Sequence, residues 1–151
     1  MRYNAQQIDF EHELLDKWGR EGRLIPVCPE VEGGLSIPRS PAELMKGDGE
    51  AVLEGRTRIL NLDGADITPA FLRGAKKALQ LALENHIRVA VLKERSPSCG
   101  VHHIYDGRFN GVTKNGSGVT TAILRKNGIM VFNENELEAV ERIITEAEKE
   151  E

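Results

Sequence analysis

Hydrophobic and polar residues follow two periods along this chain, and stretches of the two kinds alternate. Apolar residues at helical spacing predict helices, whereas short, nearly continuous apolar runs predict strands. The helical period covers residues 6–20, 68–84, 119–126 and the stretch after Asn133, and the apolar runs cover 24–27, 57–62, 87–92 and 129–132. Alternating helices and strands are typical of parallel sheets covered by helices. The pattern therefore predicts a single three-layer α/β domain over residues 1–151, with a mostly parallel, Rossmann-like sheet.

The stretches between these elements are rich in turn-forming residues. We interpret residues 32–55 as an ordered loop with one helical turn at 42–45, and a loop of this length is often functional. Residues 104–118 are interpreted as a turn-rich segment that contains a short hairpin. Asn133 is predicted to cap the last helix, with Glu136 three residues later as its capping-box partner.

Composition narrows the classes of protein to consider. Of the 151 residues, 40% are hydrophobic and 29% are charged, which are ordinary values for a globular domain. The formal net charge of -4 gives no basic footprint, so nucleic acid is not the expected partner. No apolar run approaches the roughly 20 residues of a membrane span, and no secretory pattern opens the chain. We therefore expect a cytoplasmic protein that binds a small molecule and keeps its cysteines reduced.

Cys28 and Cys99 each follow an apolar run directly. If both runs are strands of a parallel sheet, both thiols lie at the sheet edge where α/β folds bind ligands. Three interpretations stay open: soft ligands for an iron–sulfur cluster or zinc, a nucleophile with a partner, or two inert buried thiols. His102 and His103 lie three and four residues after Cys99, so a zinc site of both cysteines and one histidine is an alternative.

Polar residues near the two cysteines supply further candidates. Glu30 is either a general acid or base, or a solvated loop carboxylate. Ser96 and Ser98 either bind substrate or cap the following turn. Arg39 offers anion binding, and Lys93 either attracts an anionic group or belongs to a solvated rim.

A series of short motifs, taken in order, resembles one bacterial protein family. The motifs are VCPE (27–30), GGL (33–35), PR (38–39), KERSPSCG (93–100), IYDG (104–107), GVT (118–120) and NGI (127–129). They span nearly the whole chain, and the combination of CPE with SPSCG is specific. On these motifs the chain resembles the thiouracil desulfidase-like family, long catalogued as a domain of unknown function.

The resemblance implies a desulfidase that uses a four-iron–four-sulfur (4Fe-4S) cluster. In that family three cysteines hold the cluster, and its open iron accepts the sulfur of a thiolated substrate such as a thiopyrimidine. Carried over by motif, Cys28 and Cys99 are two of the cluster ligands. Glu30 and Ser96 are the acid/base and proton-relay candidates. The residues expected to bind substrate are Arg39, Lys93 and Ser98.

One family motif has no counterpart in this sequence. The family's first strand ends in serine–any residue–cysteine–leucine–leucine–glycine, which supplies the remaining cysteine, and this chain begins at Met1 with only two cysteines. One hypothesis is that Met1 marks a misplaced start. Others are a degenerate family member, or a homodimer that completes an open sheet edge. This form is expected to be inactive, and a non-catalytic binding module and a zinc protein stay as alternative functions.

Overall fold

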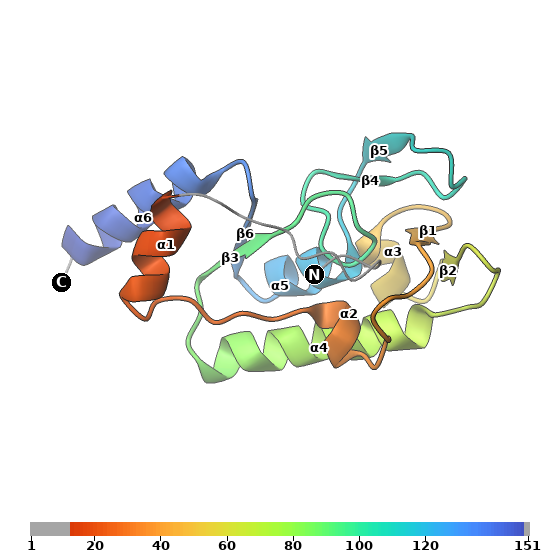
Figure 1. Cartoon of the computed structure of the whole chain (residues 1–151), viewed down its shortest axis with the longest axis horizontal. Coiled ribbons are helices and arrows are strands. Elements are labelled where there is room, and N and C mark those ends of the chain that lie inside the picture. Colours follow the sequence, from red (N-terminus) through yellow and green to blue (C-terminus); the bar gives the residue numbers. More distant parts are fainter. Residues whose placement is uncertain (1–12, 150–151) are drawn as a thin grey trace.

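The computed structural model describes residues 13–149, in which helices alternate with short strands along the chain (Figure 1). The helices are α1 (Glu13–Arg20), α2 (Pro29–Glu32), α3 (Gly49–Leu53), α4 (Thr68–Glu84), α5 (Val119–Lys126) and α6 (Leu137–Lys149). The strands are β1 (Ala42–Leu44), β2 (Ile59–Asn61), β3 (Val89–Leu92), β4 (His103–Tyr105), β5 (Thr113–Asn115) and β6 (Met130–Asn133). None of the described helices is long and apolar enough to cross a membrane.

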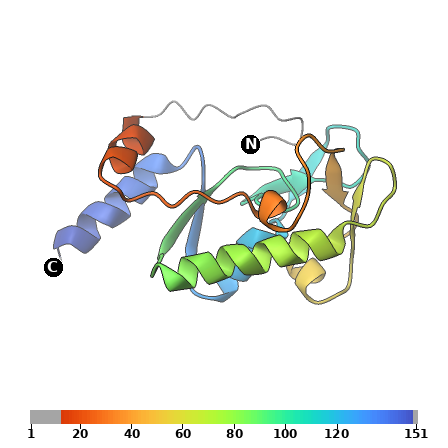
Figure 2. The same cartoon turned by 60° about the horizontal axis from the view of Figure 1, so that its bottom comes forward.

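The parallel pair β3–β6 lies between two layers of helices, as Figure 2 shows. Side chains alternate between the two faces of a strand, so each face of β3 meets a different layer. Val89 and Val91 pack in the cluster around Trp18, with α1 and α6. Ala90 and Leu92 pack in the cluster formed with α4 and α5. Around this pair of strands the arrangement has the three layers that the sequence predicts.

The predicted mostly parallel sheet is not what the described residues form. They form three two-stranded sheets, of which β3–β6 is parallel and β1–β2 and β4–β5 are antiparallel. Within residues 13–149 the fold is a small mixed α/β domain, and the prediction of a mostly parallel sheet was wrong. Alternation of helices and strands identifies the elements, but it does not determine which strand edges meet. The hairpin predicted within residues 104–118 is confirmed as β4–β5.

The strand predicted at residues 24–27 is also wrong. The segment has no regular secondary structure and joins no ladder in the described structure. Leu24, Ile25 and Val27 are 45%, 41% and 36% exposed. A narrow apolar groove of about 50 Å³ lies between this segment and β3, lined in part by Ile25, Val27 and Ala90. A run with strand composition becomes a strand only where a neighbouring edge accepts its hydrogen bonds.

Other element predictions hold at their bounds or shift by a few residues. The helices predicted at residues 68–84 and 119–126 are confirmed as α4 and α5. The first helix is confirmed over Glu13–Arg20, and its predicted beginning at residues 6–12 lies outside the described residues. The residues predicted as a helical turn at 42–45 instead contain β1, because β1 pairs with β2.

The last helix begins later than predicted. Asn133 is the final residue of β6, and α6 begins at Leu137. The predicted side-chain contact still forms, because Glu136 Oε1 accepts the backbone N–H of Asn133 at 2.9 Å. The pair therefore closes the turn between β6 and α6 instead of capping the helix itself.

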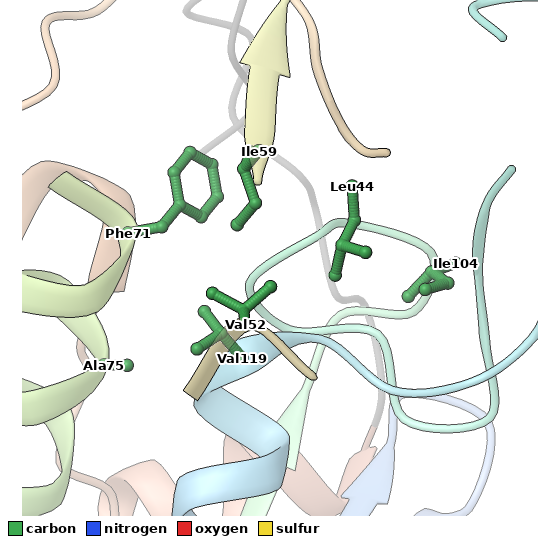
Figure 3. Close-up of a cluster of buried hydrophobic side chains, with 7 residues drawn as sticks. All are labelled: Leu44, Val52, Ile59, Phe71, Ala75, Ile104 and Val119. Atoms are coloured by element: carbon green, nitrogen blue, oxygen red, sulfur yellow. The ribbon is translucent and has the colours of Figure 1, made fainter. Parts of the chain in front are cut away.

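A hydrophobic core joins the antiparallel strands to three helices (Figure 3). Phe71 of α4 points toward Ile59 of β2, and Val119 of α5 lies beside Val52 of α3. These four side chains are at most 1% exposed. Burial of Val119 fixes the beginning of α5, the part of that helix that meets the loop after β3.

Helix α2 lies against α4 at a contact that admits only glycine. A Cβ atom added to Gly74 of α4 would lie 1.8 Å from the carbonyl oxygen of Pro29. One added to Gly33, just after α2, would lie 2.0 Å from the carbonyl oxygen of Ala70. Real Cβ atoms essentially never come within 3.0 Å of such atoms, so the two backbones touch directly. This contact determines where α2 sits.

We predict that Gly74→Ala destabilises the fold. Alanine favours a helix interior by about 0.5–1 kcal/mol over glycine, but the clash with Pro29 outweighs this, so the free energy of unfolding should fall by about 2 kcal/mol. Gly19→Ala is the matched control, because Gly19 is also helical and its nearest neighbour would be 3.8 Å from the new Cβ. That variant should be slightly stabilised. Urea denaturation measures both, and equal effects would contradict the prediction.

Candidate metal and acid–base site

Cys28 and Glu30 are positioned by the short helix α2. Cys28 directly precedes α2, and its carbonyl oxygen accepts the N–H of Glu32 at 2.9 Å. Pro29 suits the first helical position, because it has no N–H to satisfy and its φ is already helical. Since the glycine contact holds α2 on α4, it also holds Cys28 and Glu30. Both residues are half-buried.

Cys99 lies in the loop between β3 and β4, and the beginning of α5 holds this loop. The first N–H groups of a helix have no partner within the helix. Here the N–H groups of residues 118, 119 and 120 donate to the carbonyl oxygens of Gly100, Pro97 and Ser98, each at 2.8 Å. Helix α5 therefore satisfies its own unpaired donors with the carbonyls of the cysteine loop.

Two hydroxyl groups shape the turn that carries Cys99. Ser96 Oγ accepts the N–H of Cys99 at 2.8 Å, and the Ser96 carbonyl accepts the N–H of Gly100 at 2.9 Å. Thr121 Oγ1 donates to the carbonyl oxygen of Cys99 at 3.2 Å. Ser96 thus lies beside the cysteine, where its hydroxyl holds the turn. Its part in proton transfer stays a prediction.

Cys28 and Glu30 lie near enough to Cys99 for their charges to act on its thiol, and the roles predicted for the three residues stay predictions. Burial raises the pKa of the Cys99 thiol to about 12, against the effect of a hydrogen bond to Ser98 Oγ at 3.6 Å. The negative charges of Glu30 and Cys28 raise this pKa further. Such charge effects act at short range, so the three groups are neighbours. In the metal-free protein Cys99 is therefore a protonated thiol at neutral pH.

Glu30 is held by Arg39, which was predicted to bind substrate. The guanidinium of Arg39 forms an ion pair with Glu30 through Nη2, and its Nη1 donates to the carbonyl oxygen of Ser36 at 3.0 Å. The side chains of Arg39 and Glu30 are 8% and 18% exposed. This partly buried ion pair holds the carboxylate of Glu30 in place, and contact of Arg39 with substrate stays a prediction.

The other two residues predicted to bind substrate also have internal partners. Lys93 Nζ lies 2.5 Å from Glu134 Oε2. Ser98 is 1% exposed, and its Oγ lies 2.7 Å from the Oγ1 of Thr120, which is fully buried. Contact of these residues with substrate stays a prediction. Thr120 was not singled out from the sequence, because nothing in its local pattern shows that it meets Ser98.

Glu94 is a second residue that the sequence analysis did not single out. Its Oε1 accepts the backbone N–H groups of Val101, His102 and His103 at 2.6, 2.8 and 2.9 Å. Its Oε2 accepts Asn133 Nδ2 at 2.7 Å. An acidic residue between a strand and an SPSCG turn is a signal for such a role. The identity of its donors, however, depends on how the loop folds back.

The two cysteine thiols at this site are suitable ligands for a soft metal centre, but they are fewer than the ligands that an iron–sulfur cluster requires. Thiolates are the preferred ligands of iron–sulfur clusters and of zinc. Within residues 13–149 no three His, Cys, Asp or Glu side chains are placed to hold one metal ion. The predicted zinc set is therefore not assembled, and His102 instead contacts Glu136 Oε1 at 3.0 Å. A cluster held by three cysteine thiolates would take the third from outside these 151 residues, which contain two cysteines.

Comparisons with known proteins point to one family. The family model described as 2-thiouracil desulfurase matches residues 1–136. The chain is 44% identical over 138 residues to the uncharacterized protein YbbK of Bacillus subtilis (strain 168), covering 90% of this chain and 89% of that protein. It also resembles the solved structure of the [4Fe-4S]-dependent thiouracil desulfidase TudS. That similarity has a TM-score of 0.86 and 44% identity, over 95% of this chain and 89% of the other.

We predict that the ionised carboxylate of Glu94 stabilises the fold, and that this stabilisation is lost when acid protonates the carboxylate. Burial alone would raise its pKa, but the hydrogen bonds from His103, Asn133, His102 and Val101 outweigh burial and lower the pKa from 4.5 to about 2. The folded state therefore binds this proton more weakly than the unfolded state does. The stabilisation is fully present above pH 4.5 and is lost as the pH falls through about 2.

Glu94→Gln tests this linkage. After allowance for solvent screening, the substitution should lower the free energy of unfolding by about 1–2 kcal/mol at neutral pH. Near pH 2 the difference between the two proteins should shrink toward zero. Urea denaturation across this pH range measures both proteins. A difference that stays constant with pH would contradict the assignment of Glu94 as the acid-labile group.

Proposed function

The chain belongs to the 2-thiouracil desulfurase family, and we propose that it removes sulfur from a thiolated small molecule such as a thiopyrimidine. The proposal includes a [4Fe-4S] cluster, the cofactor named for the solved relative. The observation that carries it is the meeting of Cys28, Glu30 and Cys99, from two distant parts of the chain, in one half-buried site. The two thiols would supply part of the ligand set of an iron centre, and the carboxylate would supply an acid–base group.

Cys28 and Cys99 would each supply a thiolate to the cluster, one from the residue before α2 and one from the loop after β3. When bound, the cluster supplies a Lewis-acidic iron with affinity for the substrate's sulfur. Cys99 must lose its proton to become a ligand, and its raised pKa makes this loss costly in the metal-free protein. Loading is therefore expected to release a proton.

Glu30 is the residue proposed to move protons in the reaction. Conversion of a thiocarbonyl to a carbonyl consumes one water and releases one hydrogen sulfide. The carboxylate of Glu30 takes one proton from the attacking water and passes it to the sulfur. The second proton of that water follows the same route as the carbonyl forms, so that the sulfur leaves as hydrogen sulfide. Arg39 acts as a positioning residue, because its ion pair with Glu30 holds that carboxylate in one orientation beside the thiols.

We predict that iron uptake depends on both cysteines and on a third thiolate. The chain is treated anaerobically with iron and sulfide, alone and with the family's cysteine-bearing N-terminal segment fused before Met1. The extended form should take up about four irons, absorb broadly near 400 nm and release sulfide from 2-thiouracil. Cys28→Ser and Cys99→Ser should each abolish uptake in that form. Failure of both forms to bind iron, or uptake that survives either substitution, would overturn the proposal.

A second prediction separates the role of Glu30 from metal binding. In the loaded extended form, Glu30→Gln should keep its iron but lower kcat by about 100-fold or more, because it removes the proton acceptor. Glu32→Gln is the matched control: Glu32 lies on the same short helix but is exposed. It should keep kcat within about twofold of the parent. If both variants lose activity equally, or neither does, Glu30 is not the acid–base group.

A further inference from the structure

The loop that carries Cys99 is closed by Glu94. Glu94 lies two residues after the end of β3. Val101, His102 and His103, whose N–H groups donate to its Oε1, lie at the far end of the loop. Successive backbone N–H groups that converge on one anion are known as an anion-binding nest. Here the bound anion is the Glu94 carboxylate of the same chain. These hydrogen bonds hold the two ends of segment 94–103 together, so the segment forms a ring that includes Cys99.

The same carboxylate joins this ring to the neighbouring strand and helix. Glu94 Oε2 accepts Asn133 Nδ2 at 2.7 Å, and Asn133 donates its backbone N–H to Glu136 Oε1 at 2.9 Å. Glu136 Oε1 also contacts His102 Nε2 at 3.0 Å, and the N–H of His102 returns to Glu94 Oε1 at 2.8 Å. These four residues form a closed polar circuit. It ties the loop to the end of β6 and to the turn before α6.

We propose that Glu94 is a positioning residue that sets where Cys99 lies relative to Cys28. The inference rests on the proposed function only in treating Cys99 as a ligand. Glu94 reaches no reacting atom, and it acts through the three N–H groups at the end of the loop. A hydrogen bond to a charged carboxylate is roughly twice as strong as one between neutral groups, so a single ionised side chain can hold a loop of this length.

The substitution Glu94→Gln removes this hold. Glutamine keeps one acceptor oxygen, but its amide group then faces the Asn133 amide, so two donors meet where an acceptor had met a donor. The loop should open more often and expose Cys99. In the metal-free chain, alkylation of Cys99 by iodoacetamide at fixed pH should become about tenfold faster, because modification follows the population of the opened loop. Peptide mass spectrometry assigns the modified cysteine.

Two control variants separate positioning from general loss of stability. Glu134→Gln removes a nearby carboxylate. Glu134 pairs with Lys93 and accepts the backbone N–H of Glu94 at 3.1 Å, but in the described structure it forms no hydrogen bond to residues 101–103. Val140→Ala weakens the core cluster of α1 and α6, where Val140 is 2% exposed. Both should leave the alkylation rate of Cys99 within about twofold of the parent, even if Val140→Ala lowers the melting temperature more than Glu94→Gln does.

The double variant Glu94→Gln with Asn133→Asp tests rescue. It moves the negative charge across the hydrogen bond, so that the glutamine amide donates to an aspartate and the net charge is unchanged. The alkylation rate of Cys99 should return at least halfway to that of the parent. If Glu94→Gln alone fails to fold, Asn133→Ala removes the bond to Glu94 Oε2 and the acceptor of the Asn135 N–H, but leaves the three N–H groups on Oε1, and a smaller rise of about threefold is expected.

The experiment needs no iron, so its outcome is independent of the proposed desulfidase activity. Faster alkylation of Cys99 in Glu94→Gln, with both controls unchanged and with rescue, supports the positioning role. An increase no larger than that of Val140→Ala overturns it, as does a double variant as reactive as Glu94→Gln alone. Failure of the iron-loading experiment with a positive result here would reject the cluster and leave the positioning of Cys99 standing.

Discussion

The backbone between β3 and β4 contains no helix or long strand, so most of its polar groups must find partners in other elements. Its carbonyl groups at Pro97, Ser98 and Gly100 accept the first N–H groups of α5, and its last N–H groups reach the carboxylate of Glu94. A buried polar group without a partner costs about 1–3 kcal/mol, so this exchange is what permits an irregular loop at the site. Among the described residues no buried side-chain nitrogen or oxygen lacks a partner.

Direct backbone contact sets the geometry between the two cysteines. Cys28 precedes α2, which touches α4 through glycine, and Cys99 lies in a loop that touches the beginning of α5. A Cβ atom on Gly118 would lie 2.4 Å from the carbonyl of Ser98, so this second contact also admits only glycine. Helices α4 and α5 pack against each other in the core. The separation of the two thiols therefore depends on how these helices pack, and small changes at either glycine contact should reach the site.

Charge at the site is arranged around an acid and a buried thiol. The ion pair of Glu30 with Arg39 gives the carboxylate a fixed partner, while Glu30 and Cys28 both disfavour a thiolate at Cys99. A positively charged metal centre between these groups would reverse that balance, because it stabilises the thiolate directly. The site is thus better suited to a metal-bound state than to free ionised thiols.

How much the sequence alone determined differs between elements. Local periodicity and turn residues were sufficient for α4, α5 and the β4–β5 hairpin. The shared site of Cys28, Glu30 and Cys99 was predicted from strand ends, and the strand expected at residues 24–27 does not form in the described structure. Tertiary structure decided the rest: strand pairing left residues 24–27 without a ladder, Arg39 pairs with Glu30, and Glu94 closes the cysteine loop. The physical reason is that periodicity reflects neighbours along the chain, whereas each of these outcomes depends on a hydrogen-bond or ion-pair partner brought close only by folding.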